Sequence, residues 1–186
     1  MQTQAPGYTE EEQLILAAQR NPEKFQPLYE KYYAAILRFV YQRTVSKEDA
    51  QDITQQVFLQ AMINLPKYEH RGFPFSSWLY RIAINELNQI FRKNEKQRGV
   101  NLEEKHLKDV IEEMDYSTAT ADERILLEVI TTLPEDDFTL IEMRFFEKRA
   151  FKEIAEILQS NEAAVKMRLY RILEKLKPEL QKRLNN

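Results

Sequence analysis

The sequence predicts an all-α protein: two small helical domains joined by an acidic linker, the C-terminal one a helix-turn-helix. Apolar residues recur at helical spacing through most of the chain, and no stretch alternates as a strand would. Only 3 of the 186 residues are Gly and 7 are Pro, so few points interrupt a helix. The expected layout is a tail over 1–9, a helical domain over 10–93, the acidic linker over 94–122 and the helix-turn-helix domain over 123–186.

The first two helices are defined by amphipathic runs and by Pro. The run 10–20 is predicted to be a short amphipathic helix that ends near Asn21. A second helix is expected over 22–45. Pro22 suits its first turn, where no backbone N–H donor is needed, and Pro27 is expected to bend it locally.

The third and fourth helices are predicted to begin at capping residues. Ser46, followed three residues later by Asp49, predicts a capping box at the start of a helix over 46–65, which Pro66 closes. After a loop, Ser76 is the expected N-cap of the helix that carries the only Trp of the chain.

One face of this fourth helix carries side chains that all donate hydrogen bonds and bear no negative charge. This donor ladder has helical spacing and consists of Arg81, Asn85, Asn88 and Arg92. Trp78 stands one turn before it, and the preceding loop contains Tyr68, Arg71, Phe73 and Phe75. Two interpretations fit. Either the aromatic residues stack on or capture a nucleic-acid base, or Trp78 and the two Phe seal the loop against the helices.

The third helix is apolar over a wide arc and has further apolar residues on its polar side. The arc, expected to face the core, contains Ala50, Ile53, Val57, Phe58 and Met62. Leu59 and Ile63 lie instead beside Asp52 and Gln56. Such a mixed outer face indicates either a protein partner or burial by another helix of the same domain.

The C-terminal segment has the spacing of a helix-turn-helix, with Asn161 as the cap of its second helix. An apolar stripe faces the core and consists of Val165, Leu169, Ile172 and Leu176. The opposite side presents Ala163, Lys166, Met167, Tyr170 and Arg171, with Arg168 on a flank. This face suits entry into a DNA major groove, and it equally fits an ordinary solvated basic helix.

Charge is distributed unevenly around a net charge of -3. From 164 onward 7 basic residues accompany 2 acidic ones, whereas over 101–123 8 acidic residues accompany 2 Lys. Only one or two helical turns are expected in this acidic linker, around 107–114. The N-terminus lacks a signal-peptide layout and no apolar run could cross a bilayer, so we expect a cytoplasmic protein without direct membrane insertion. The absence of Cys excludes disulfides and thiolate metal sites.

The order and spacing of these segments resemble the extracytoplasmic-function (group IV) subfamily of bacterial sigma-70 factors. "DAQDITQQVFLQA" is similar to the segment that docks on the clamp helices of RNA polymerase, and "FSSWLYRIAINEL" to the reader of the promoter −10 element. The segment from "LPEDDF" to "RLYRI" is similar to the domain that reads the −35 element. The resemblance implies core RNA polymerase, promoter DNA and an anti-sigma factor as partners, and no cofactor, metal or small-molecule substrate. It also implies that the acidic linker threads the channel where RNA emerges.

The resemblance also assigns residues to these roles. The expected −10 contacts are Tyr68, Arg71, Phe73, Trp78, Arg81, Asn85, Asn88 and Arg92. The expected −35 contacts are Asn161, Ala163, Lys166, Met167, Arg168, Tyr170 and Arg171. The expected polymerase contacts are Asp49, Asp52, Gln55, Gln56 and Leu59. Gln159 stands where the family often has Gly, and because a left-handed residue other than Gly costs about 1 kcal/mol, a slightly different turn is expected.

Three other classes of function fit the sequence less well. A stand-alone helix-turn-helix regulator with an N-terminal sensing domain is the alternative, although a sensing domain has no need of the donor ladder. An enzyme is disfavoured because the only two His residues, His70 and His106, lie in predicted loops without metal-ligand spacing or a paired nucleophile. A purely helical adaptor leaves the basic C-terminal face without a purpose.

Overall fold

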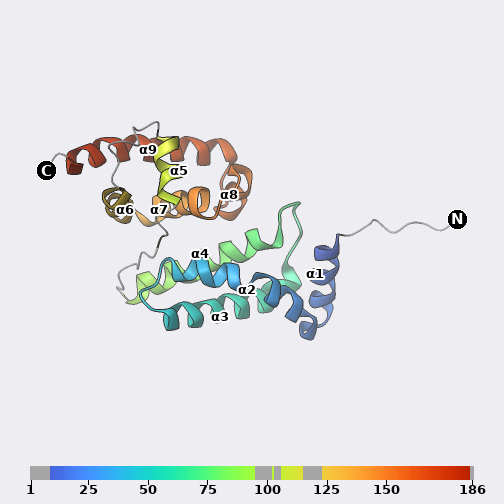
Figure 1. Ribbon diagram of the computed structural model, residues 1–186. Helices are drawn as coiled ribbons and strands as arrows, with labels where there is room; N and C mark the ends of the chain where they lie inside the picture. The colour runs from blue at the N-terminus through green and yellow to red at the C-terminus, as the bar shows by residue number, and fades with distance from the viewer. Residues whose placement is uncertain (1–8, 95–101, 103–105, 115–122, 185–186) are drawn as a thin grey trace. The chain divides into compact units, whose positions relative to one another are not determined.

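The computed structural model describes residues 9–94, 102, 106–114 and 123–184, and it divides the chain into two units, Met1–Gly99 and Val100–Asn186. Every regular element in this described part is a helix, as the sequence predicts (Figure 1). Within the same residues, no helix is both long enough and apolar enough to cross a membrane.

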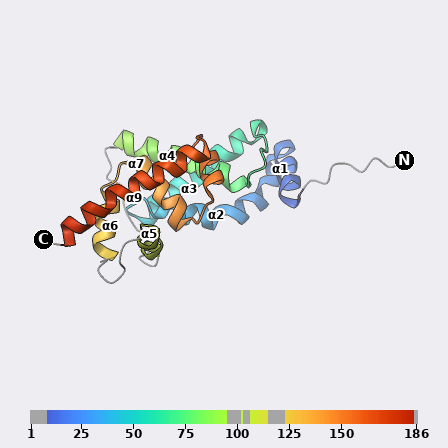
Figure 2. The same ribbon diagram turned by 90° about the horizontal axis from the view of Figure 1, so that it is seen from above.

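The first unit contains three long helices and a short one across their end. Figures 1 and 2 show the long helices side by side: α2 (Gln26–Tyr41), α3 (Lys47–Asn64) and α4 (Phe75–Asn94). The short helix, α1 (Glu10–Arg20), contacts α2 and the turn Leu65–Lys67 that follows α3. This contact places α1 beside the loop that leads into α4.

Local capping explains where the helices of the first unit begin. The hydroxyl of Thr9 accepts a hydrogen bond from the amide of Glu12 (3.2 Å), and the Glu12 carboxylate accepts one from the Thr9 amide (2.7 Å). This reciprocal pair is a capping box that the sequence reading missed. The predicted cap at Ser46 is confirmed, because its hydroxyl accepts from the amide of Asp49 at 3.0 Å.

Two predictions about this unit are wrong. Ser76 does not cap α4, which begins one residue earlier, and the amide of Ser77 donates to the carbonyl of Pro74 at 2.9 Å. Ser76 is buried in the first turn instead. Pro27 does not bend a long helix, because the short 3-10 turn Pro22–Phe25 ends first and Pro27 lies in the first turn of α2. Proline is well suited to that position because its missing N–H leaves no hydrogen bond unmade.

The second unit is built around its long last helix, α9 (Glu162–Leu184), which contacts three shorter helices. These are α6 (Glu123–Thr131), α7 (Glu135–Ile141) and α8 (Phe151–Ile157). The π-helical turn Glu142–Phe146 continues α7. All four residues of the predicted α9 core stripe are buried, as the periodicity indicates.

Part of the predicted acidic linker belongs to the core of the second unit. Helix α5 (Leu107–Glu113) contacts α6 and the π-helical turn, and it buries Leu107, Val110 and Ile111. The sequence reading foresaw the helical turns here, but not their burial, because acidic residues dominate the local composition. The tail 1–8 and the linker segments 95–101, 103–105 and 115–122 lie outside the described residues.

The turn between α8 and α9 contains a residue other than Gly in the left-handed backbone conformation. Gln159 has φ 53°, its amide donates to the carbonyl of Glu156 (3.3 Å), and the amide of Ser160 donates to Ala155 (2.8 Å). These two bonds form a Schellman motif. Hydrogen bonding therefore holds Gln159 in a left-handed conformation that Gly would adopt without strain. Asn161 caps α9 as predicted by accepting from the amide of Ala164 at 2.8 Å.

Candidate nucleic-acid and partner interfaces

The aromatic residues before and within α4 form one packed cluster. The ring of Trp78 lies 4.8 Å from that of Tyr68 and 5.4 Å from that of Phe75, measured between centroids. Phe75 is fully buried, whereas Tyr68 and Trp78 keep part of their surface exposed. The sealing interpretation is therefore confirmed for Phe75, and the base-binding interpretation stays a prediction. Phe75 seals the loop against the helices, and Trp78 packs on the loop while leaving some of its ring accessible.

The donor ladder lies on an accessible face of α4. Asn85 and Arg92 are exposed, while Arg81 and Asn88 are partly exposed. The Nε of Arg92 donates to the backbone carbonyl of Asn88 at 3.1 Å, so one of its donors is already used. In the loop before the helix, Arg71 is exposed and Phe73 partly so. The structure thus brings the predicted −10 residues onto one continuous stretch, the loop and the exposed side of the helix that follows it.

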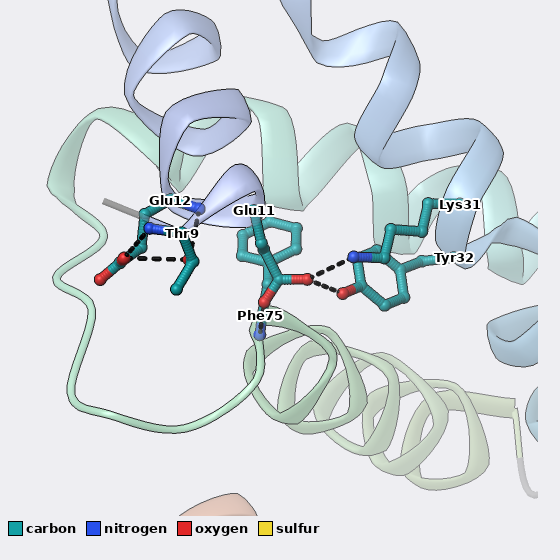
Figure 3. A network of polar contacts seen from close by, with 6 residues as sticks. All are labelled: Thr9, Glu11, Glu12, Lys31, Tyr32 and Phe75. Atoms are coloured by element: carbon teal, nitrogen blue, oxygen red, sulfur yellow. Dashed lines mark hydrogen bonds and ion pairs between the residues drawn. The ribbon is translucent and has the colours of Figure 1, made fainter. Parts of the chain in front are cut away.

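A carboxylate from α1 supports this stretch, and sequence reasoning missed it. Glu11 accepts hydrogen bonds from the Nζ of Lys31 (2.8 Å), the backbone amide of Phe75 (3.0 Å) and the hydroxyl of Tyr32 (Figure 3). Burial alone would raise the pKa of Glu11, but these hydrogen bonds, that of Lys31 foremost, outweigh it and lower the pKa. Burial, followed by the hydrogen bond to Glu11, raises the pKa of Tyr32 to about 12. The only sequence sign was three consecutive Glu at the start of α1, an ordinary feature of a helix N-terminus.

The outer face of α3 is largely exposed, so no described helix of the first unit covers it. Asp52, Gln55 and Leu59 are exposed, Asp49 and Gln56 are partly so, and Ile63 is 59% exposed. Most of the expected core arc is buried against α2 and α4, but Met62 is 38% exposed, which contradicts its expected place in the core. Met62 therefore adds its exposed side chain to the apolar surface formed by Leu59 and Ile63 on α3.

The predicted recognition face of α9 is also exposed. This group comprises Asn161, Ala163, Lys166, Met167, Arg168, Tyr170 and Arg171. Arg168 differs from the other cations of the face, since its guanidinium is 2.7 Å from a carboxylate oxygen of Asp137 on α7. Arg171 and Lys175 line a groove of about 610 Å³ beside this ion pair. Across the described residues, no three His, Asp or Glu side chains gather in a way that could hold a metal ion.

Two family models match this chain, one on each unit. The model of sigma-70 region 2 matches residues 28–97, and that of sigma-70 region 4 matches residues 123–176. The first match contains most of α2, all of α3 and α4 and the loop between these two, and the second contains α6 to α8 and most of α9.

Curated relatives agree with these matches. RNA polymerase sigma factor SigV of Bacillus subtilis is 30% identical over 145 residues, covering 78% of this chain and 84% of the relative. ECF RNA polymerase sigma-E factor of Haemophilus influenzae is 28% identical over 178 residues, covering 90% and 94%. ECF RNA polymerase sigma factor BldN of Streptomyces coelicolor is 26% identical, and the match spans 83% of this chain but only 59% of BldN.

Solved structures support the fold. CnrH, in complex with the cytosolic domain of CnrY, matches with a TM-score of 0.64 at 19% identity, covering 92% of this chain and 97% of CnrH. The sigma factor RpoE, in complex with the anti-sigma factor NepR from Bartonella quintana, matches with a TM-score of 0.57 at 16% identity, covering 86% and 98%.

Proposed function

Since this chain belongs to the extracytoplasmic-function subfamily of sigma-70 RNA polymerase sigma factors, we propose that its two units divide the reading of a promoter between them. As a sigma factor it binds core RNA polymerase and directs promoter-specific transcription initiation. The observation that carries the proposal is that regions 2 and 4 match separate units, each of which exposes a face rich in hydrogen-bond donors.

In this proposal the first unit reads the −10 element. The exposed Asn and Arg side chains of the donor ladder contact base edges and phosphates, and Trp78 stacks at the edge of the melted region. The loop Tyr68–Pro74 receives a base that leaves the duplex, a mode of recognition that needs aromatic or apolar walls. Tyr68 and Phe73, both partly exposed, supply these walls.

The outer face of α3 is the proposed docking surface for the clamp helices of the polymerase. Leu59, Met62 and Ile63 offer apolar area that a partner helix could bury, and Asp52 with Gln55 supplies a polar margin. Gln55 and Gln56 carry no charge, so the apolar residues carry more of this docking than charge does.

The second unit is proposed to read the −35 element with α9. Lys166 and Arg171 are exposed cations on the side opposite the buried stripe, which suits contacts with phosphates and guanine edges in a major groove. Met167 and Tyr170 are exposed on the same face and add apolar surface that could contact the DNA bases. Arg168 is a weaker candidate for a base contact because it already pairs with Asp137.

Further partners follow from relatives. RpoE from Bartonella quintana was solved with an anti-sigma factor, and CnrH with the cytosolic domain of CnrY, so we propose an anti-sigma partner for this chain as well. We also propose that the protein works in the cytoplasm without catalytic activity, cofactor or small-molecule substrate of its own, since the polymerase supplies the chemistry of RNA synthesis.

Run-off transcription on a randomised promoter library, by core polymerase with and without the chain, tests the proposal. The expected result is a set of start sites that depend on the chain and share two spaced elements. No new start sites, together with binding of duplex DNA by the chain alone, would favour the stand-alone regulator.

A matched pair of variants tests the docking surface. Asp52→Lys with Gln56→Lys places two cations on the outer face of α3 and is expected to abolish co-elution with core polymerase. The control is Gln26→Lys with Glu30→Lys, which makes the same charge change at the same spacing on exposed positions of α2. Normal co-elution of the first variant would refute the assignment.

A further inference from the structure

Helix α1 contacts both ends of the loop that is proposed to receive the −10 base. At the entry, the Nε2 of Gln19 donates to the carbonyl oxygens of Leu65 (3.0 Å) and Tyr68 (2.8 Å). At the exit, Glu11 accepts from the amide of Phe75 (3.0 Å). Between these points, Glu12 lies 3.2 Å from the Nδ1 of His70. One short helix therefore holds the loop at its entry, middle and exit.

The exit contact is the most firmly built of the three. Lys31 and Tyr32 of α2 bond the same carboxylate, so Glu11 cannot leave the Phe75 amide without losing two further partners (Figure 3). The ring of Tyr32 also packs on that of Phe75, with 5.8 Å between centroids. A carboxylate that accepts from the first amide of a helix acts as an N-cap supplied from elsewhere in the chain, and the helix dipole strengthens it.

The tip of the loop has fewer constraints. Gly72 has φ 76°, and an added Cβ there would meet no atom within 4 Å. Arg71 and Pro74 are exposed. Because the tip stands in open space, the conformation of the loop depends strongly on how its ends are held.

We propose that α1 is the positioning element of this loop, with Gln19 and Glu11 holding its two ends so that it is already shaped to receive a base. The inference rests on the function proposed above, because a base can enter the loop only after the promoter duplex has been melted. Neither residue needs to touch DNA. Gln19 and Glu11 act on the opening of the promoter. A loop that they did not hold would have to become ordered at that step, at a cost in conformational entropy.

The free protein tests the positioning itself. Trp78 is the only Trp and packs on Tyr68, so its fluorescence reports the position of the loop without polymerase or DNA. In Gln19→Ala we expect greater quenching of Trp78 by acrylamide and about tenfold faster hydrogen exchange of the loop amides, the loss expected for two hydrogen bonds. Gln19→Glu, which sets a carboxylate against the same two carbonyls, should do the same while α1 remains helical.

Glu11→Gln is the second test variant, and Glu10→Gln is its matched control. Both remove one negative charge from the first turn of α1, but Glu10 is exposed at the helix surface and Glu11 bonds Phe75. Only Glu11→Gln should accelerate exchange of the Phe75 amide. Equal exchange in wild type, Glu11→Gln and Gln19→Ala would overturn the proposal.

The holoenzyme tests the consequence. On a fully duplex promoter, Gln19→Ala should slow open-complex formation by about tenfold. On a promoter with mismatched −10 positions, where the bases are already unpaired, the variant should come within about twofold of wild type. An equal loss on both templates, or none on either, would overturn the positioning role.

The same experiment separates this inference from the function on which it rests. If wild type itself produced no chain-dependent start sites, the proposed function would fail, and the inference with it. If wild type is active and Gln19→Ala matches it on duplex promoters, only the inference fails.

Discussion

The two units expose their proposed DNA-binding residues in different ways. In the second unit, α9 carries the recognition residues on one face and buries Val165, Leu169 and Ile172 on the other. In the first unit, the loop before α4 depends on hydrogen bonds from α1, 46 to 64 residues away in the chain. One interface is local, and the other is assembled from distant segments.

The difference predicts how each interface responds to substitution. A side chain on the exposed face of a helix can be removed without disturbing its neighbours, because the backbone is held by its own hydrogen bonds and by the buried face. A loop held by distant contacts loses its shape when any one of them fails. Substitutions on the exposed face of α9 should therefore change affinity for DNA and leave stability intact, whereas those around the loop should change both.

The largest expected effect comes from Phe75, which is fully buried and packs on the rings of Tyr32, Tyr68 and Trp78. Phe75→Ala should lower the free energy of unfolding of the first unit by about 3–5 kcal/mol. Urea unfolding followed by Trp78 fluorescence reports this unit alone, because it holds the only Trp.

The matched change in the second unit is Tyr170→Ala, at a residue that is 42% exposed. It should alter the free energy of unfolding, followed by circular dichroism, by no more than about 0.5 kcal/mol. Similar losses of stability in the two variants would remove the contrast between the units.

The same contrast explains what the sequence could and could not predict. The cap at Asn161 and the core stripe of α9 follow from spacing within one helix, and both are confirmed. The bond between Glu11 and Phe75 joins residues 64 positions apart, and no periodicity reports it. Ser76 was expected to cap α4 because only local caps are visible in a sequence, whereas the cap of the Phe75 amide comes from another helix.

The burial of helix α5 is hard to predict from the sequence for a related reason. Its acidic residues gave the segment the composition of a linker, although Leu107, Val110 and Ile111 have the spacing of a buried face. That spacing becomes informative only when a partner surface is known, and the partners here are α6 and the π-helical turn Glu142–Phe146. The donor ladder of α4 and the recognition residues of α9, by contrast, lie on accessible faces as their helical spacing predicts.

The next effect separates two neighbouring cations of α9. Arg171→Ala should weaken use of promoters through the −35 element by about 1–3 kcal/mol, the value expected for a lost base contact. Arg168→Ala should cost less than about 1 kcal/mol, because Arg168 must leave Asp137 before it can bind DNA. Transcription from a library randomised at −35 measures both. Unchanged −35 selectivity in Arg171→Ala would count against its role.

A smaller effect is expected in the turn before α9. Gln159 has φ 53°, a conformation that Gly adopts without strain, so Gln159→Gly should raise the free energy of unfolding of the second unit by about 1 kcal/mol. Gln159→Ala is the control, since Ala keeps the Cβ that causes the strain and should bring no such gain. Thermal unfolding followed by circular dichroism makes the comparison, and equal stability of the two variants would show that the turn is unstrained.

The smallest effect concerns the dependence of the first unit on pH. Folding lowers the pKa of Glu11 below its ordinary value of 4.5, so the folded state favours the ionised carboxylate. Its contribution is therefore complete above pH 4.5 and disappears as the pH falls through the lowered pKa of the folded state. Glu11→Gln removes this dependence, because an amide does not titrate in this range.

Wild type should thus exceed Glu11→Gln in stability at pH 7, and the two should converge as the pH falls below 4.5. The difference at pH 7 is expected to be about 0.5 kcal/mol, since solvent reaches the ion pair with Lys31 and screens it. Urea unfolding at several pH values, followed by Trp78 fluorescence, measures it. Glu10→Gln, which removes an exposed charge one residue earlier, should track wild type throughout. A constant difference between wild type and Glu11→Gln from pH 7 to pH 3 would mean that shape, and not the charge of Glu11, ties α1 to the start of α4.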